Sequence, residues 1–139
     1  MNDNLIYWIV LVLAVFVVFV LQNRPAPPPL SAETFTGKAR HIVDGDTLYI
    51  RGHKPAIRLW GVDAPERDKR GFNAATAHLK SLAQGKRLEC RKIDIDRYGR
   101  TVARCFLKDG REINAEMIAS GTAKEYRQFS KGFYSSVRR

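Results

Sequence analysis

Cysteine and histidine are scarce in this sequence, and their scarcity limits the metal sites that it can contain. The 139 residues include two cysteines, three histidines and no Cys-x-x-Cys motif. Structural zinc sites need four such ligands at short spacings, so none is expected. Cys90 and Cys105 lie in the strand-like stretches RLECRKI and VARCFL, on either side of a turn. We expect them either to form a disulfide across a hairpin or to remain two small buried thiols.

Charged residues are absent from residues 5–21, which are seventeen consecutive apolar residues. This length is close to the minimum that crosses a bilayer core of roughly 30 Å. A core helix of the globular part is the alternative. The first four residues, MNDN, lack the Lys or Arg that begins a cleaved signal peptide. We therefore predict a short tail (residues 1–4) and a single transmembrane helix or uncleaved signal anchor over residues 5–22. Arg24 alone flanks it, too little charge to set its orientation.

Acidic residues are also in short supply. The chain has 24 Lys and Arg against 14 Asp and Glu, a net charge of +10. The whole of this net charge follows a proline-rich stretch, residues 23–33, which is expected to be an extended spacer. The remaining residues, 34–139, form the predicted domain. Its positive charge favours a polyanionic partner, which leaves nucleic acid, anionic lipid and acidic polysaccharide open.

The order of predicted elements in this domain is that of a small β-barrel. Apolar and polar residues alternate on both sides of Asp44-Gly45, which predicts a hairpin. A third strand (AIRLWGV) precedes an amphipathic helix (GFNAATAHLKSLAQGK), and two further strands precede a short helix (EINAEMIASG). The predicted fold class is α+β: a five-stranded oligonucleotide-binding-type β-barrel with two short helices, preceded by the single N-terminal transmembrane helix.

Three short motifs carry the functional signal: VDGDT, RLWGVDAPE and DRYGR. Each alone is compatible with an ordinary surface turn or a salt-bridged strand end. Together, in this order and spacing, they resemble the staphylococcal nuclease (thermonuclease) family, which consists of calcium-dependent nucleases built on an oligonucleotide-binding barrel. The resemblance extends from about Thr36 to Tyr126. Family members usually continue into a longer terminal helix, so we expect a C-terminally truncated domain whose stability is affected first.

The resemblance implies a calcium site made of Asp46, Asp63 and the main-chain carbonyl of Ala64. The family often has threonine at the position of Ala64, but a carbonyl ligand does not depend on the side chain. Calcium takes six to eight oxygen ligands, so two carboxylates and one carbonyl leave room for water and a phosphate oxygen. The chain then turns at Pro65, and we call residues 63–66 the proline corner. This corner holds a further carboxylate, Glu66, three residues beyond Asp63.

The resemblance also implies the catalytic and substrate-binding residues. Glu66 matches the glutamate proposed as general base, and Arg58 and Arg100 match the arginines that bind the scissile phosphate. Arginine suits this role because its planar fork pairs with two oxygens and stays charged. The implied nucleotide-contacting residues are Arg97, Tyr98 and Tyr126.

The predicted function is a calcium-dependent phosphodiesterase that hydrolyses DNA and/or RNA by metal-assisted attack of water on phosphorus. We expect its domain to lie outside the cytoplasm, because calcium at the concentrations that weak sites need is found there. No obligate protein partner is predicted. The main alternative is a catalytically weak or inactive nucleic-acid-binding barrel tethered to the membrane. A binder of lipid or anionic polymer would explain the charge but leave the three motifs unexplained.

Overall fold

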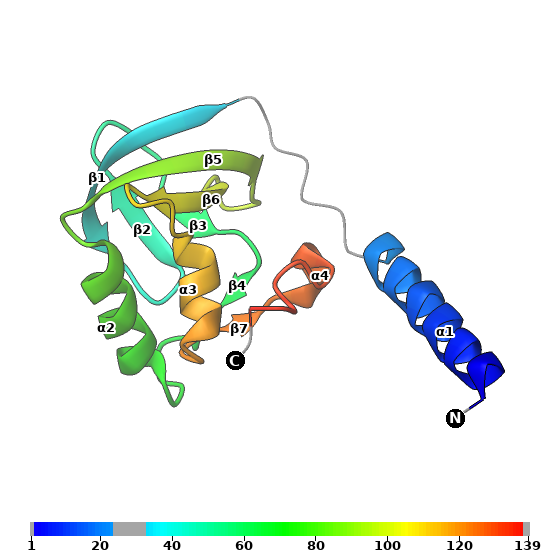
Figure 1. Ribbon diagram of the computed structural model, residues 1–139. Coiled ribbons are helices and arrows are strands. Elements are labelled where there is room, and N and C mark those ends of the chain that lie inside the picture. The colour runs from blue at the N-terminus through cyan, green and yellow to red at the C-terminus, as the bar shows by residue number, and fades with distance from the viewer. Residues whose placement is uncertain (1, 24–32, 138–139) are drawn as a thin grey trace.

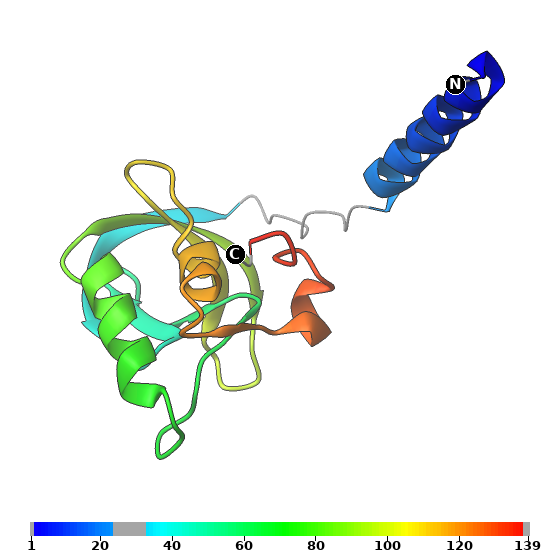
Figure 2. The ribbon, with the colours of Figure 1, turned by 60° about the horizontal axis from the view of Figure 1, so that its bottom comes forward.

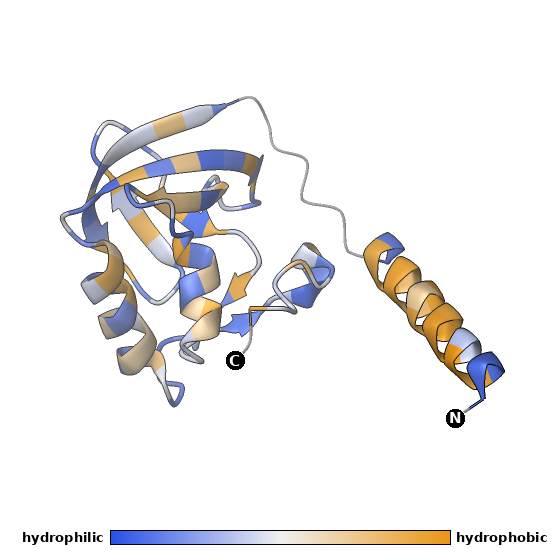
Figure 3. Cartoon of the chain, viewed as in Figure 1, coloured by the Kyte–Doolittle hydropathy of each residue, from blue (hydrophilic) through white to orange (hydrophobic). Residues whose placement is uncertain are grey.

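A computed structural model describes residues 2–23 and 33–137 of the protein. Most of the predicted proline-rich spacer therefore lies outside the described residues. Helix α1 (Asp3–Gln22) contains the predicted apolar span and begins two residues before it. All of its side chains are exposed and nearly all are apolar, as Figure 3 shows. This exposure does not fit a core helix, whereas a signal sequence or a membrane anchor has these properties.

Five strands close into the predicted barrel (Figure 1). Neighbouring strands are antiparallel except for β3 and β6, which pair in parallel. Going round the barrel, the strands are β1 (Thr34–Ile42), β2 (Thr47–Ile50), β3 (Ile57–Leu59), β6 (Thr101–Leu107) and β5 (Arg87–Ile95). This is the strand arrangement of an oligonucleotide-binding barrel.

The two predicted hairpins set the register of the barrel. Asp44-Gly45 lies in the turn between β1 and β2, where Ile42 pairs with Leu48. In the second hairpin Cys90 on β5 lies directly opposite Cys105 on β6. Their Cα atoms are 4.1 Å apart and a disulfide joins them, which settles the alternative left open by the sequence. The disulfide links the two strands that carry the 96–100 loop.

The predicted third strand is shorter than expected because the chain turns at Gly61. This residue has φ of 69°, a left-handed conformation that glycine adopts without strain. Beyond the turn, β4 (Val62–Asp63) leaves the barrel and pairs with β7 (Lys124–Glu125) in a second, two-stranded sheet. The sequence had not predicted this sheet. As a result, the corner that carries Asp63 is joined to the C-terminal part of the chain.

Within the described residues 33–137, three helices accompany the barrel, one more than predicted. Helix α2 (Phe72–Ala83) buries Ala75, Leu79 and Leu82, as its apolar spacing predicts, while Phe72 is only partly buried. Helix α3 (Ile113–Ala119) matches the second predicted helix. The additional helix, α4 (Arg127–Ser130), is a single turn near the C-terminus.

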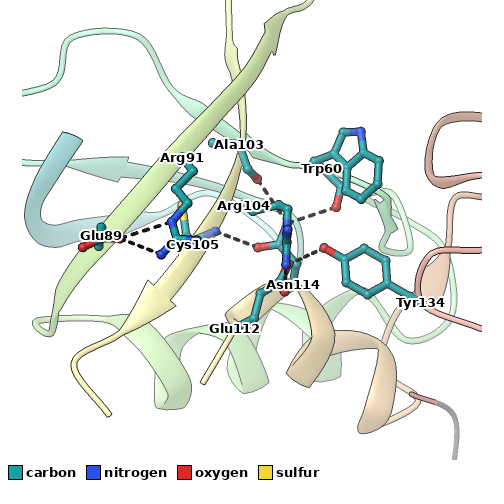
Figure 4. Close-up of polar contacts among 9 residues, drawn as sticks. All are labelled: Trp60, Glu89, Arg91, Ala103, Arg104, Cys105, Glu112, Asn114 and Tyr134. Carbon is teal, nitrogen blue, oxygen red and sulfur yellow. Dashed lines mark hydrogen bonds and ion pairs between the residues drawn. The ribbon is translucent and has the colours of Figure 1, made fainter. Parts of the chain in front are cut away.

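A buried asparagine on α3 joins this helix to the barrel. Asn114 donates from Nδ2 to the carbonyls of Trp60 (3.0 Å) and Ala103 (3.1 Å), and its Oδ1 accepts from the N–H of Cys105 (3.0 Å). Figure 4 shows these contacts. They satisfy main-chain groups where β3 ends beside β6, and such buried groups are costly to leave unpaired.

Two glutamates fix the C-terminal segment. Glu112 accepts hydrogen bonds from Arg104 (2.7 Å) and from the hydroxyl of Tyr134, whose side chain is buried (Figure 4). Glu125 on β7 accepts from the Ser130 hydroxyl (2.5 Å) and from the Tyr134 N–H (2.9 Å). The residues that follow β7 are therefore packed onto the domain.

Candidate active site

The turn between β1 and β2 places Asp46 at the centre of the candidate site. Asp44 shapes this turn by accepting a hydrogen bond from the Asp46 N–H (3.0 Å). A Cβ atom on Gly45 would lie 2.6 Å from the Cβ of Ala75 and 2.7 Å from that of Ala64. Only glycine allows so close an approach. The turn therefore packs directly against α2 and against the proline corner.

Asp46 is a buried carboxylate with three donors. Its Oδ2 accepts from the Ala64 N–H (3.0 Å) and pairs with Arg58 Nη2 (3.2 Å), while its Oδ1 accepts from the Thr47 hydroxyl (3.0 Å). Burial raises the pKa of Asp46 to about 6, an effect that Arg58 opposes and the neighbouring charge of Asp44 reinforces. The protein thus compensates this negative charge only in part, and a bound cation would stabilise it further.

The two predicted catalytic arginines meet at Asp46 and Thr47. Arg58 pairs with the Asp46 carboxylate and donates to the Leu59 carbonyl (2.8 Å). Arg100 reaches the Thr47 hydroxyl from the other hairpin, with 3.4 Å between Nη1 and Oγ1. The Thr47 hydroxyl therefore links Asp46 to Arg100. Sequence analysis had not selected Thr47, although it belongs to the VDGDT motif.

Asp96 holds Arg100 in place and was also missed as a site residue. Its Oδ2 lies 2.7 Å from Arg100 Nε, and its Oδ1 accepts from the N–H groups of Tyr98 (2.9 Å) and Arg100 (3.0 Å). Partial burial acts to raise the pKa of Asp96, but the hydrogen bonds from Arg100 and Tyr98 outweigh it and lower the pKa. An aspartate that opens a glycine-containing turn is the signal that predicts such bonding.

Asp63 and Glu66 are exposed and make no side-chain hydrogen bond or ion pair with the described residues. Asp63 precedes Ala64, whose N–H binds Asp46. The Ala64 carbonyl accepts no hydrogen bond from any residue in the described ranges. Asp63 and the Ala64 carbonyl supply oxygen atoms without a partner in the described ranges, and Asp46 supplies a carboxylate whose charge is compensated only in part. Carboxylate and carbonyl oxygens are the ligands that a hard cation takes. In residues 2–23 and 33–137, no three His, Cys, Asp or Glu side chains cluster as a metal site.

Exposed aromatic rings lie on the 96–100 loop and beside the turn at Gly61. Tyr98 is 68% exposed, and its ring has the guanidinium carbons of Arg97 and Arg100 at 4.8 and 5.3 Å from its centroid. Tyr126 is fixed by its N–H, which donates to the Gly61 carbonyl (2.8 Å). Its ring packs edge-on against exposed Phe129, with centroids 4.8 Å apart. Phe129 was not among the predicted nucleotide-contacting residues.

Known proteins are similar to this chain in sequence. A family model described as "Staphylococcal nuclease homologue" matches residues 56–137. This range includes Arg58, Asp63, Glu66 and Arg100 but begins after Asp46. The matched residues are more than half of the chain.

Among the similar proteins, succinoglycan biosynthesis protein ExoI of Rhizobium meliloti is 36% identical over 118 residues, covering 77% of this chain and 60% of that protein. An uncharacterized endonuclease of Escherichia coli O157:H7 is 32% identical over 104 residues, covering 73% of this chain and 68% of the relative. The thermonuclease of Staphylococcus hyicus is 32% identical over 138 residues, with 86% and 80% coverage. This chain thus spans less than two thirds of the first of these relatives. On these matches and on the barrel that the structure shows, the chain belongs to the staphylococcal nuclease family.

Proposed function

We propose that the protein is a membrane-tethered, calcium-dependent nuclease that hydrolyses phosphodiester bonds of DNA and/or RNA. The observation that carries this proposal is the convergence of Arg58 and Arg100 on the Asp46–Thr47 pair, beside the exposed carboxylates of Asp63 and Glu66. The two arginine cations suit a phosphate, and the partly compensated Asp46 carboxylate beside them suits a metal ion. The relatives named as nucleases support the same activity.

The roles of the side chains follow from their surroundings. Arg58 and Arg100 bind the scissile phosphate and stabilise the negative charge that grows on its oxygens as water attacks. Glu66 has no protein partner in the described ranges, so its carboxylate is available to take a proton from that water. Asp96 orients Arg100 through the 2.7 Å pair. Calcium held by Asp46, Asp63 and the Ala64 carbonyl would supply further positive charge next to the phosphate.

In this proposal, exposed aromatic and basic side chains bind the nucleotide. Tyr98 is exposed at the 96–100 loop, and Arg97 donates to its hydroxyl (2.8 Å). Bases stack on such rings with little sequence preference. Tyr126, whose main-chain N–H is bonded to the Gly61 carbonyl, contributes a second ring.

We further propose that the chain consists of a membrane anchor over residues 5–22, a spacer over residues 23–33 and an extracytoplasmic nuclease domain over residues 34–139. The exposed apolar helix α1 supports the anchor. The Cys90–Cys105 disulfide supports the compartment, because disulfides persist mainly in oxidising environments.

The test is hydrolysis of single-stranded DNA by the full chain in neutral detergent, first with calcium and then with excess chelator. We expect strand cleavage that stops on chelation and returns when calcium is restored. Equal cleavage in excess chelator would contradict the calcium mechanism. Retained DNA binding without any cleavage would instead favour the inactive nucleic-acid-binding barrel. An Asp63→Asn variant serves as a control, because its calcium dependence should shift to higher concentration.

A further inference from the structure

An open cavity whose lining includes four basic residues lies beside the candidate active site. It has a volume of about 900 Å³ and is bounded by the turn after β1, the loop between β4 and α2, and the first turns of α2. Figure 2 shows this loop, in green, extending away from the barrel. We call this cavity the basic pocket. The lining residues that matter here are Val43, Arg67, Lys69, Arg70 and Lys80.

The cations of the basic pocket are unpaired. Four basic side chains line it against a single acid, Asp68. None of the four makes a side-chain hydrogen bond or ion pair with another residue in the described ranges. Some basic residues elsewhere are paired: at the end of the β5–β6 hairpin opposite the 96–100 loop, Arg111 pairs with Asp109 at 2.9 Å. Unpaired cations gathered around one cavity repel one another, so a bound anion would relieve an unfavourable charge arrangement.

The basic pocket adjoins the catalytic residues directly. Arg67 follows Glu66, and Val43 precedes the Asp44–Asp46 turn. That turn packs against α2 at Ala75, the helix whose first turns line the pocket. The pocket therefore lies next to the residues at which the proposed scissile phosphate would bind.

We propose that the basic pocket binds backbone phosphates of the substrate strand beyond the scissile bond, and so makes the enzyme favour polynucleotides over very short substrates. This inference rests on the proposed nuclease function. A nucleic acid strand fits the observations better than a lipid surface does, because the cations surround a concavity next to the catalytic groups. A bilayer is broad and meets outward-facing surfaces, whereas a strand can enter a cavity with its phosphates.

The binding experiment compares two triple variants of the full chain in neutral detergent. Lys69→Gln/Arg70→Gln/Lys80→Gln neutralises the basic pocket and leaves Arg67, next to Glu66, unchanged. Lys86→Gln/Arg87→Gln/Lys108→Gln removes the same charge at the far end of the β5–β6 hairpin. Fluorescence anisotropy measures binding of a single strand of about 12 nucleotides, within the roughly 4–16 that one such barrel covers. A phosphorothioate backbone keeps the strand's charge and slows its hydrolysis.

We expect the pocket variant to bind the strand on the order of tenfold more weakly at low salt. The slope of log affinity against log salt should become shallower by about two, since single strands release roughly 0.7 counterions per phosphate contact. The control variant should keep a slope close to that of the unchanged chain. Equal affinities and slopes for the two triple variants would overturn the proposal, because the effect would then be one of net charge alone.

A second measurement separates the possible partners of the pocket. Acetylation of Lys69 and Lys80 by an amine-reactive reagent should slow when DNA is added. It should not slow when the full chain is placed in nanodiscs that contain anionic lipid. Protection by lipid and not by DNA would assign the pocket to the membrane and overturn the inference. If the unchanged chain binds DNA through the pocket yet never cleaves it, only the proposed catalysis fails.

Discussion

At the scale of single residues, Asp46 combines burial with incomplete charge compensation. Its pKa is raised from 3.8 to about 6, chiefly by burial. Because the folded value lies above the unfolded one, the protonated form stabilises the calcium-free protein at pH 4, and this contribution is lost as pH rises through about 6. In the proposed calcium site the metal would require the ionised form, so proton and metal would compete for this carboxylate.

We therefore predict that calcium affinity falls steeply as pH drops below about 6. Calcium should raise the melting temperature at pH 7 clearly more than at pH 5. Isothermal titration and thermal denaturation of the full chain in detergent would measure both effects. In Asp46→Asn the pH dependence between 5 and 7 should disappear along with most of the affinity. An unchanged affinity at pH 5 would show that Asp46 is not a ligand.

Glu66 is predicted to act in catalysis and not in binding. Glu66→Gln keeps the size and hydrogen-bonding capacity of the side chain but removes its basicity. Turnover should fall about a hundredfold or more, the scale of a lost general base. Affinities for calcium and for nucleotide should stay within about threefold of the unchanged chain. A variant that retains full turnover would remove Glu66 from the mechanism.

Arg100 is predicted to contribute more to the transition state than to the ground state. Arg100→Ala removes a guanidinium that is aligned by Asp96 and lies near Thr47. Turnover should fall by on the order of a hundredfold or more, with a smaller change in the Michaelis constant. Asp96→Asn is the matched control: it keeps the charge of Arg100 but weakens its alignment, so its loss should be intermediate. If Arg100→Ala changed affinity alone, Arg100 would be a binding residue.

At the scale of elements, the C-terminal segment supports the corner that carries Asp63. Strand β7 pairs with β4, placing Lys124 opposite Asp63. The residues after β7 are attached through the contacts of Tyr134 with Glu112 and of Ser130 with Glu125. The buried Tyr134 ring also packs against Trp60, with centroids 5.7 Å apart. The two-stranded sheet and α4 therefore form one unit with the end of β3.

We predict that Tyr134→Phe lowers the free energy of unfolding by about 1–3 kcal/mol. The change removes the hydroxyl that donates to Glu112 but keeps the ring, so the loss reports a partly buried carboxylate that has lost one partner. Denaturant unfolding of the full chain in detergent measures it. Tyr49→Phe is the control, because the Tyr49 hydroxyl makes no hydrogen bond with the described residues. Equal stabilities of the two variants would contradict the structural role of the contact.

At the scale of the whole molecule, the disulfide bears both on the stability of the fold and on the cellular compartment in which the protein folds. Cys90 and Cys105 are fully buried and close a loop with a sequence separation of 15. That loop carries Asp96, Tyr98 and Arg100. Closing it contributes about 3 kcal/mol in the chain-entropy model. A disulfide that forms in the cell also requires an oxidising environment, which matches a domain exported beyond the membrane.

We predict that the protein isolated from its native membrane, with free thiols blocked at lysis, contains this disulfide. Mass spectrometry of its peptides should show Cys90 linked to Cys105 and neither cysteine blocked. The Cys90→Ala/Cys105→Ala variant should keep the fold but lose about 3 kcal/mol of stability. Two blocked, unlinked cysteines would remove the support for an extracytoplasmic domain.

The sequence by itself determined much of this protein. Alternation of apolar residues around Asp44-Gly45 and the spacing of Ala75, Leu79 and Leu82 predicted the hairpin and α2, and the structure confirms both. The apolar run predicted the exposed helix α1. The three motifs identified the family, which the comparisons confirm. These features succeed because turn chemistry and side-chain periodicity depend on neighbouring residues.

Only the tertiary structure decided which distant residues meet. The contact between Arg100 and Thr47 spans 53 residues, and the bond from Ala64 to Asp46 spans 18. The departure of β4 from the barrel at Gly61 likewise depends on β7, which lies far along the chain. No local pattern encodes these pairings. These pairings form when the barrel closes, because closure brings loops that are distant in sequence next to one another. The buried polar groups then have few partners available, and each must be hydrogen-bonded by one of them.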